Sequence, residues 1–312
     1  MDLRQLEAVR EVVATGSVTG AAAVLHCTPS AVSQQLRIAE RLAGTALVER
    51  DGRGVRPTAA GRALAARAVD VAVAVERAKA AVADHAARPT GTVRVSAFQS
   101  AGELLFPRLL AAIDRHDGVE VECVENDVAQ DAFIPLTAQA DIVIAHRPVR
   151  SAPFTDPGLT VARLLREPLD VALPPGHPLA DRDELGAADL AHEEWITVHD
   201  GYPIAGVVQE LAARSGSVLT IRHRINDFHV TEAMVAAGQG IALLPRYAVG
   251  ARPGGRVVLR PLRGLKPGRF IEALVRADRG ERRVVRTVLQ ELRDQAAVVV
   301  AAHENRDGRR GG

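Results

Sequence analysis

The sequence predicts a multidomain α/β protein, with helices at its N-terminal end and alternating strands and helices beyond residue 91. Three patterns carry this prediction. Apolar residues recur at helical spacing over the first 45 residues, an alanine- and valine-rich helical stretch follows, and short apolar strands alternate with helical segments in the rest of the chain. A length of 312 residues is enough for two or three domains that each bury a core.

The overall charge is nearly balanced, with 39 basic and 38 acidic residues. Residues 1–62 carry eight arginines and six acidic residues, so a polyanion would meet this end first. No secretory pattern precedes the first helix, and no apolar run approaches the roughly 20 residues that span a bilayer. We therefore predict a cytoplasmic protein with no membrane partner, in which Cys27 and Cys123 are core thiols. The alternative is a thiol redox switch, which the absence of neighbouring basic residues in the sequence disfavours.

The first helix is predicted from "DLRQLEAVREVVATGS", which begins with the capping residue Asp2 and ends at Gly16. A second, shorter helix covers about residues 19–26 and contains small alanines that allow close helix packing. Thr28 then suits an N-cap and Pro29 a first helical turn, where a missing N–H costs nothing. The pair predicts a tight turn between two helices, which is a helix-turn-helix.

The third helix carries a polar stripe opposite its apolar face. The stripe consists of Ser30, Ser33, Gln34 and Arg37. A helix fits the major groove of DNA, where such side chains hydrogen-bond to base edges and phosphates. By itself, this stripe is more typical of an ordinary solvent-facing helix than of a DNA-reading one.

A wing is predicted directly after this helix. "ALVERDGRGVRPTAAG" gives two short strands, 46–49 and 55–57, around a turn built from Asp51-Gly52 and Arg53-Gly54. Arg53 at the tip would enter a narrow minor groove, whose potential attracts arginine. Residues 1–58 are therefore predicted to be a winged helix-turn-helix DNA-binding domain.

The run from Leu3 to Leu64 closely resembles the N-terminal domain of LysR-type transcriptional regulators. The matching phrases are "GS" before the second helix, "AVSQQL" in the third, "L.ER" into the wing and "TAAG" after it. The resemblance implies DNA contacts by Thr28, Ser30, Ser33, Gln34 and Arg53. Many members of the family have arginine where this chain has Gln34, so its base preference cannot be carried over.

A long linker helix is predicted over residues 59–88, ending before Pro89. Its apolar residues step by four and three, which is typical of a coiled-coil seam. The seam residues are Leu64, Ala68, Val71, Val75, Ala78 and Val82. The stripe could also pack on its own domain, but the family resemblance implies that this helix forms the dimer contact.

Beyond the linker "PTG", strands such as "TVRVSAF", "VEVECVE" and "DIVIA" alternate with helical stretches such as 207–214 and 230–238. This pattern predicts a parallel-rich sheet covered by helices on both faces. Pro107 and Pro135 should kink or restart the helices that contain them.

The same region resembles the effector-binding domain of LysR-type regulators, itself similar to periplasmic binding proteins with two α/β lobes around a cleft. The matching phrases are "DIVIAHRP", "PLDVALPPGHPLA" and "EAMVAAGQGIALLP". The resemblance places this domain at 91–303, with lobe one at 91–162 and 268–303 and lobe two at 163–267. The polar residues 304–312 are expected to form a disordered tail.

Effector contacts are predicted where polar or aromatic residues follow the carboxyl ends of strands, beside helix N-termini. These residues are Gln99, Ser100, Asn126, Thr197, His199, Asn226 and Phe228. Each could equally be a helix cap or loop residue. The resemblance favours Ser100 and Thr197, whose positions are comparable to those of ligand-contacting hydroxyls in the family.

The predicted function is a LysR-type DNA-binding regulator whose operator binding is modulated by a small-molecule effector. The predicted partners are double-stranded operator DNA, the effector, further copies of the chain in a homodimer or homotetramer, and RNA polymerase. An enzyme is not expected, because "GQGIA" follows a helix instead of a strand and no catalytic, metal or cofactor motif is recognisable. The alternatives are an architectural or replication-linked winged-helix protein without effector control, and a solute-binding protein, which would normally be exported.

Overall fold

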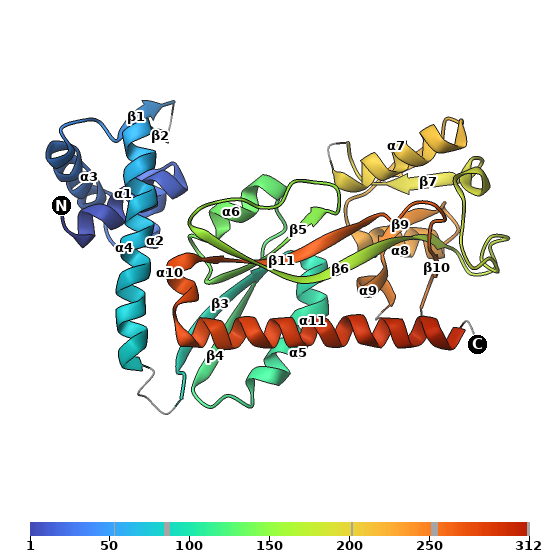
Figure 1. The fold of residues 1–312 in the computed structure, drawn as a ribbon. Helices are drawn as coiled ribbons and strands as arrows, with labels where there is room; N and C mark the ends of the chain where they lie inside the picture. The colour runs from blue at the N-terminus through green and yellow to red at the C-terminus, as the bar shows by residue number, and fades with distance from the viewer. Residues whose placement is uncertain (53, 84–87, 201, 251–254, 311–312) are drawn as a thin grey trace.

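The computed structural model describes residues 1–52, 54–83, 88–200, 202–250 and 255–310. An N-terminal helical head, a long helix and a two-lobed α/β domain follow one another along the chain (Figure 1). The arrangement confirms the predicted fold class. Within the described residues, no helix is both long and apolar enough to cross a membrane.

The head, which we call the reading head, consists of α1 (Leu3–Thr15), α2 (Val18–Val24), α3 (Pro29–Ala43) and a hairpin of β1 (Val48–Asp51) and β2 (Gly54–Pro57). Its core is formed by apolar residues of all three helices, among them Val9, Val12, Val32 and Leu36. Asp2 and Thr28 cap α1 and α3, as the sequence predicts. Gly16 ends α1 in the left-handed conformation, at φ 63°. Its carbonyl oxygen accepts a hydrogen bond from the N–H of Val55 in β2, so the turn that follows α1 also holds the wing in place.

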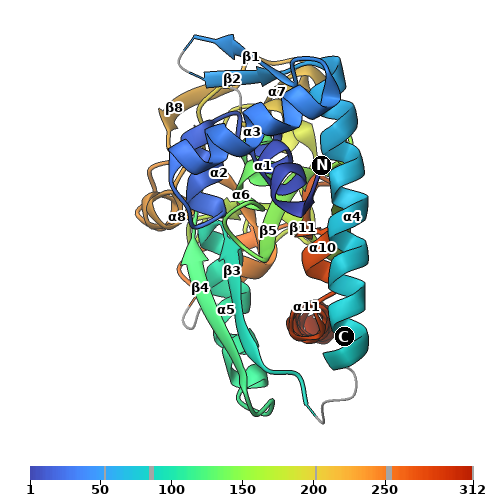
Figure 2. The same cartoon turned by 90° about the vertical axis from the view of Figure 1, so that its left-hand side faces the viewer.

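Helix α4 (Ala59–Ala83) leaves the wing and runs along α1 and α10 (Ala277–Gly280). Figure 2 shows α4 standing beside the reading head, with α10 next to it. The predicted linker helix extends to residue 88, but residues 84–87 lie outside the described residues.

Lobe one is built around β3 (Gly91–Ala97), which pairs in parallel with both β4 (Val119–Glu125) and β5 (Ile142–Pro148). Its helices are α5 (Gln99–Ile113), the short α6 (Phe133–Leu136) preceded by a 3-10 turn at Gln130–Ala132, and α11 (Arg283–Arg310). Apolar residues of β3, β5, α5 and α11 form the largest core cluster.

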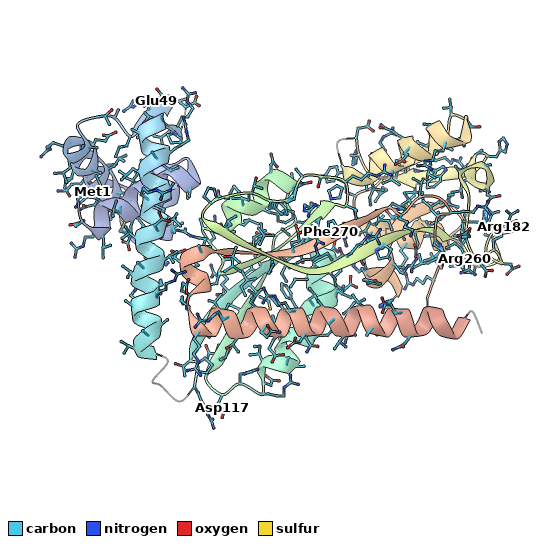
Figure 3. The ribbon with its side chains drawn as sticks, viewed as in Figure 1. Met1, Glu49, Asp117, Arg182, Arg260 and Phe270 are labelled. Carbon is cyan, nitrogen blue, oxygen red and sulfur yellow. The ribbon has the colours of Figure 1, made fainter. Side chains whose placement is uncertain are left out.

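Two long strands, β6 (Leu159–Leu173) and β11 (Gly268–Arg276), connect the lobes. They pair antiparallel, β11 also pairs with β5, and the far end of β6 pairs with β9 (Ala242–Pro245) and β10 (Val258–Arg260). Phe270, labelled in Figure 3, lies on β11 in the middle of the molecule, with the guanidinium groups of Arg147 and Arg163 over its ring. The sheet is therefore mixed, with fewer parallel pairs than the sequence suggests.

Lobe two adds the parallel pair β7 (Glu194–Thr197) and β8 (Thr220–Arg224) with helices α7 (Pro203–Ser215), α8 (Phe228–Ala236) and α9 (Arg246–Gly250). A 3-10 turn at Ala187–Leu190 precedes β7. The buried Trp195 lies in the core of this lobe.

Three expectations differ from the structure. Pro107 lies within α5, which continues from Gln99 to Ile113 instead of restarting at the proline, because burial of its apolar face offsets the one backbone hydrogen bond that proline removes. Cys27 is exposed instead of buried, because it lies in the turn between α2 and α3. In the described residues, α11 continues to Arg310, into the segment expected to be a disordered tail, although Asn305, Asp307 and Gly308 are poor helix formers.

Candidate functional site

The stripe predicted on the third helix lies on the outer face of α3. Thr28, Ser30, Gln34 and Arg37 are exposed, and Ser33 is half-buried, while Val32 and Leu36 point into the core. The polar groups of Ser30, Ser33, Gln34 and Arg37 make no hydrogen bond or ion pair to any described residue. They are therefore available to a partner outside the chain.

Local contacts hold α3 and the wing in place. The hydroxyl of Thr28 accepts a hydrogen bond from Ala31 N–H (3.2 Å), and Gln5 of α1 donates to Gln35 of α3 (3.0 Å). The carboxylate of Glu40 accepts hydrogen bonds from the backbone of Leu47 and Val48, where β1 begins. These hydrogen bonds connect α3 to α1 on one side and to the start of the wing on the other.

The wing lies at the outer end of the reading head, where Figure 3 labels Glu49. Glu49 forms an exposed ion pair with Arg56 on the facing strand, at 2.7 Å. Arg53, which the sequence places at the tip, lies outside the described residues.

The predicted dimer seam on α4 is divided between two environments. Leu64 and Ala68 are half-buried and buried, respectively, against the head, and Val71 and Val75 border a groove between α1 and α4. The remaining two seam residues, Ala78 and Val82, are exposed, and 76% of the surface of Val82 is accessible to solvent. The N-terminal end of the seam therefore packs within the chain itself, whereas its C-terminal end is exposed to solvent.

A cavity of about 380 Å³ lies between the lobes. Of the seven predicted effector contacts, four line it: Gln99, Ser100, Asn226 and Phe228. Gln99 and Ser100 form the first turn of α5, and Phe228 begins α8, whose N-terminus is capped by Asp227. The wall therefore brings together the ends of segments that are more than 100 residues apart in the sequence.

The other three predicted contacts do not line this cavity. The side chain of Asn126 donates a hydrogen bond to Ser96 Oγ of the neighbouring strand β3, at 3.0 Å. His199 is exposed, and its backbone N–H donates to Asn226 Oδ1 at 3.0 Å. Thr197 is buried at the end of β7, and its hydroxyl has no hydrogen-bond partner within the described part of the chain. The neighbouring Val198 faces the cavity in its place.

Among the described residues that line the cavity, Arg269 of β11 is the one arginine or lysine. The sequence analysis did not predict it as a site residue. Its guanidinium group donates to Glu167 of β6 at 2.7 and 2.9 Å and to Ser100 Oγ at 2.8 Å. Glu167, fully buried, also accepts hydrogen bonds from the backbone N–H groups of Tyr247 and Ala248 in α9. This pair connects α5 of lobe one with α9 of lobe two.

Aromatic rings surround this cation. The guanidinium carbon of Arg269 lies 4.9 Å from the ring centre of Phe98 and 5.7 Å from that of Phe228. His146 packs edge-on against Phe98, at 4.6 Å between ring centres. Removal from water and the charge of Arg269 lower the pKa of His146 to about 3, so its imidazole is neutral at physiological pH.

One ion pair and one histidine–carboxylate contact cross between the lobes at the surface. Arg150, after β5, contacts Glu210 of α7 at 2.6 Å, and His229 of α8 contacts Glu103 of α5 at 3.2 Å. All four side chains are at least partly exposed to water, and surface contacts of this kind contribute little to stability.

Comparisons with known proteins place these two units in one family. Residues 3–62 match the family described as "Bacterial regulatory helix-turn-helix protein, lysR family", and residues 86–297 match the "LysR substrate binding domain". The chain is 29% identical over 302 residues to the Hca operon transcriptional activator HcaR of Escherichia coli, covering 96% of this chain and 97% of HcaR.

Solved structures show the same fold. Full-length OxyR from Pseudomonas aeruginosa, in a variant form, matches with a TM-score of 0.67 and 21% identity, covering 95% of this chain and 94% of that one. CbnR complexed with its target DNA matches with a TM-score of 0.53 and 21% identity, covering 95% of this chain and 100% of CbnR.

Proposed function

The chain belongs to the LysR family of bacterial transcriptional regulators, and from this premise we propose that α3 reads an operator under the control of a small molecule held in the interlobe cavity. The observation that carries the proposal is the exposed stripe of α3. Its polar side chains have no partner among the described residues, although the rest of the head is tightly packed. Recognition of base edges requires exposed polar side chains whose hydrogen-bonding groups are not already used within the protein.

The proposed DNA contacts are Ser30, Ser33, Gln34 and Arg37, with Thr28 at the N-terminus of α3 and Arg53 from the wing. The experiment is a selection of duplexes from a randomised library by the full-length protein, followed by fluorescence anisotropy on the enriched sequence. Arg37→Ala should weaken binding to enriched and scrambled duplexes alike, since arginine neutralises phosphate. Failure of the wild-type protein to enrich any sequence would contradict the proposal.

The proposed effector site is the cavity itself, with Gln99, Ser100, Asn226 and Phe228 as contacts. Its size, its aromatic wall and its few polar groups are typical of sites for small organic ligands. A ligand that binds only the folded protein raises its unfolding midpoint. In a screen of small organic compounds, a true effector should raise this midpoint in wild-type protein and in Val218→Ala, on the far surface of lobe two, but not in Phe228→Ala.

We further propose that the chain works as a homodimer or homotetramer whose α4 helices pair through the uncovered part of the seam. Val82 and Ala78 support this, because an isolated helix gains nothing by exposing apolar residues at coiled-coil spacing. Two reading heads on a two-fold axis would also match two operator half-sites.

The proposed place of action is the cytoplasm, where a bacterial regulator meets its operators. HcaR is named as a transcriptional activator. This supports RNA polymerase as a further partner of the DNA-bound protein.

A further inference from the structure

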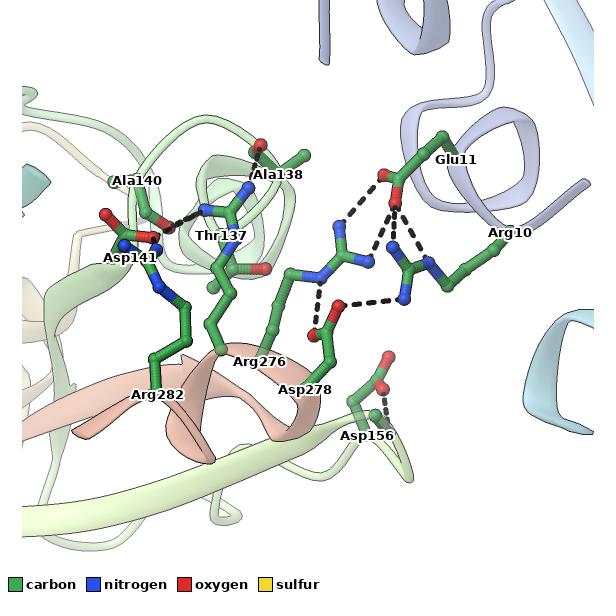
Figure 4. A network of polar contacts seen from close by, with 12 residues as sticks. Arg10, Glu11, Thr137, Ala138, Ala140, Asp141, Asp156, Arg276, Asp278 and Arg282 are labelled. Carbon is green, nitrogen blue, oxygen red and sulfur yellow. Dashed lines mark hydrogen bonds and ion pairs between the residues drawn. The ribbon is translucent and has the colours of Figure 1, made fainter. Parts of the chain in front are cut away.

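Four charged side chains join the reading head to the effector-binding domain, and we call this group the latch. It consists of Arg10 and Glu11 on α1, Arg276 at the end of β11 and Asp278 in α10. Figure 4 shows the four side chains converging from the two domains. The partners across the interface are more than 260 residues apart in the sequence.

The contacts form a closed set. Arg276 binds both carboxylate oxygens of Glu11, at 2.7 and 2.9 Å. Arg10 donates to Glu11 at 2.9 Å and to Asp278 at 2.8 Å, and Arg276 Nε lies 3.4 Å from Asp278. Two cations and two anions thus balance, and each charge faces two of the opposite sign.

The latch is shielded from water. The side chain of Glu11 is 1% exposed and that of Arg276 is 9% exposed. Burial alone would raise the pKa of Glu11, but the hydrogen bonds and charge of Arg276, together with Arg10, hold it below its ordinary value. The carboxylate is therefore ionised and held in place by its partners.

The domain side of the latch is anchored to lobe one. Arg279, next to Asp278, donates to the carbonyl oxygens of Ala140 (2.6 Å) and Ala138 (3.0 Å), and Arg282 donates to Asp141 (2.9 Å). These contacts also appear in Figure 4. A movement of the end of lobe one would consequently carry Arg276 and Asp278 with it.

The same strand connects the latch to the cavity. β11 starts with Gly268 and Arg269 in the cavity wall and ends with Arg276 in the latch. Seven residues of extended strand span about 23 Å at roughly 3.3 Å per residue. β11 is hydrogen-bonded to β5 on one side and to β6 on the other, with one register shift against β6 between Ile271 and Glu272, so the strand runs from the cavity to the latch without a loop.

We propose that the latch is a releasable dock for the reading head, and that β11 transmits the state of the cavity to it. In the docked state, the latch fixes the orientation of α1, and with it α3, on lobe one. A ligand that shifts Arg269 and β11 misaligns Arg276 with Glu11 and frees the head to reorient. The docking stands on the contacts alone, whereas the control by ligand rests on the proposed function of the cavity.

The chemistry of the contact suits reversible docking. Buried ion pairs gain little over their separated, hydrated partners, because desolvation offsets the attraction. Docked and released states can then lie close in free energy. Removing one partner is different, because it leaves an uncompensated buried charge and favours release.

The first experiment is amide hydrogen exchange on the full-length protein. Glu11→Gln and, as an independent variant, Asp278→Asn should each speed exchange in both α1 and α10 by about tenfold, with α5 and β3 unchanged, because only the local opening is affected. The matched control is Glu122→Gln, which breaks the exposed pair with Arg94 on lobe one and should change neither segment. Unchanged exchange of α1 in both latch variants would overturn the dock.

The second experiment tests transmission without the need for a known effector. Arg269→Lys disturbs the cavity wall, and Ser100→Ala removes only one hydrogen bond there; each should speed exchange of α1 in the otherwise wild-type protein. In the Glu11→Gln background, neither should have any further effect, because the latch is already open. If the cavity variants leave α1 unchanged, or add to Glu11→Gln in full, β11 does not act through the latch.

The two proposals fail in different ways. A protein that selects no DNA sequence contradicts the proposed function but leaves the exchange pattern of the latch intact. A protein that binds its selected duplex with the same affinity and the same exchange in wild-type and Glu11→Gln forms contradicts the latch alone.

Discussion

Arg269 and Arg276 lie seven residues apart on β11, and each is bound by a buried carboxylate from a different element. Glu167 of β6 holds Arg269 in the cavity wall, and Glu11 of α1 holds Arg276 against the reading head. One strand therefore carries a cation at the candidate effector site and a second cation at the contact with the DNA-binding head. This relationship gives the two domains a direct physical connection.

Gln34→Ala should reduce discrimination between the selected duplex and a scrambled one by about 1–3 kcal/mol, as expected for loss of a bidentate base contact. The affinity for scrambled DNA should change little. Fluorescence anisotropy on both duplexes measures the difference. Gln209→Ala on the exposed side of α7 is the matched control and should bind like the wild type; equal losses on both duplexes would show that Gln34 does not read bases.

Gly61→Ala should destabilise the reading head by about 1–3 kcal/mol or more, because overpacking forces the backbone to move. A Cβ at this position would lie 1.9 Å from the carbonyl oxygen of Leu47, which precedes the wing. Gly206 of α7 has nothing within 4 Å of such a Cβ, so Gly206→Ala should stabilise α7 by about 0.5–1 kcal/mol. Chemical denaturation followed by circular dichroism tests both; a neutral Gly61→Ala would contradict the close approach.

His146 makes the stability of the effector-binding domain depend on pH. Its pKa is about 3 in the folded protein against 6.5 as the ordinary value, so the unfolded chain binds a proton in this range and the folded chain does not. Stability therefore falls as the pH drops below about 6.5, by about 2 kcal/mol between pH 7 and pH 5. The His146→Gln protein should lose about 2 kcal/mol less stability than the wild type between pH 7 and pH 5. If the free energy of unfolding falls equally in both proteins over this range, the low pKa of His146 is refuted.

Val82→Asp should weaken dimerisation by at least about tenfold, because each copy would bury an unpaired carboxylate against the apolar seam of the other. Sedimentation velocity at a series of protein concentrations measures the effect. Ala63→Asp lies on the same helix but off the seam, and should dimerise normally. A Val82→Asp protein that sediments like the wild type would exclude this part of α4 from the interface.

The reading head could be predicted from the sequence because its signals are local. Asp2, Gly16 and the Thr28-Pro29 pair fix helix ends within a few residues of themselves. The polar stripe of α3 follows from helical periodicity alone. The same kind of reasoning placed Gln99 and Ser100 at the cavity, since they directly follow a strand and begin a helix.

The features that sequence reasoning missed depend on distant partners. Arg269 is recognisable as a cavity residue only once β11 pairs with β6 and brings Glu167 beside it. The latch likewise joins α1 to the end of β11, and neither Glu11 nor Arg276 belongs to a motif. Thr197 does not line the cavity, because a strand end fixes only the neighbourhood of a side chain, and here the next residue, Val198, faces inward.

The central claim is that the exposed face of α3 selects DNA sequence. The most direct measurement is genome-wide mapping of bound sites for the wild-type protein and for a Ser30→Ala/Gln34→Ala double variant produced at the same level. The account predicts that the wild type occupies a limited set of sites sharing two related half-sites, and that the double variant loses them while retaining the folded head. Occupancy of the same sites by both proteins would contradict it.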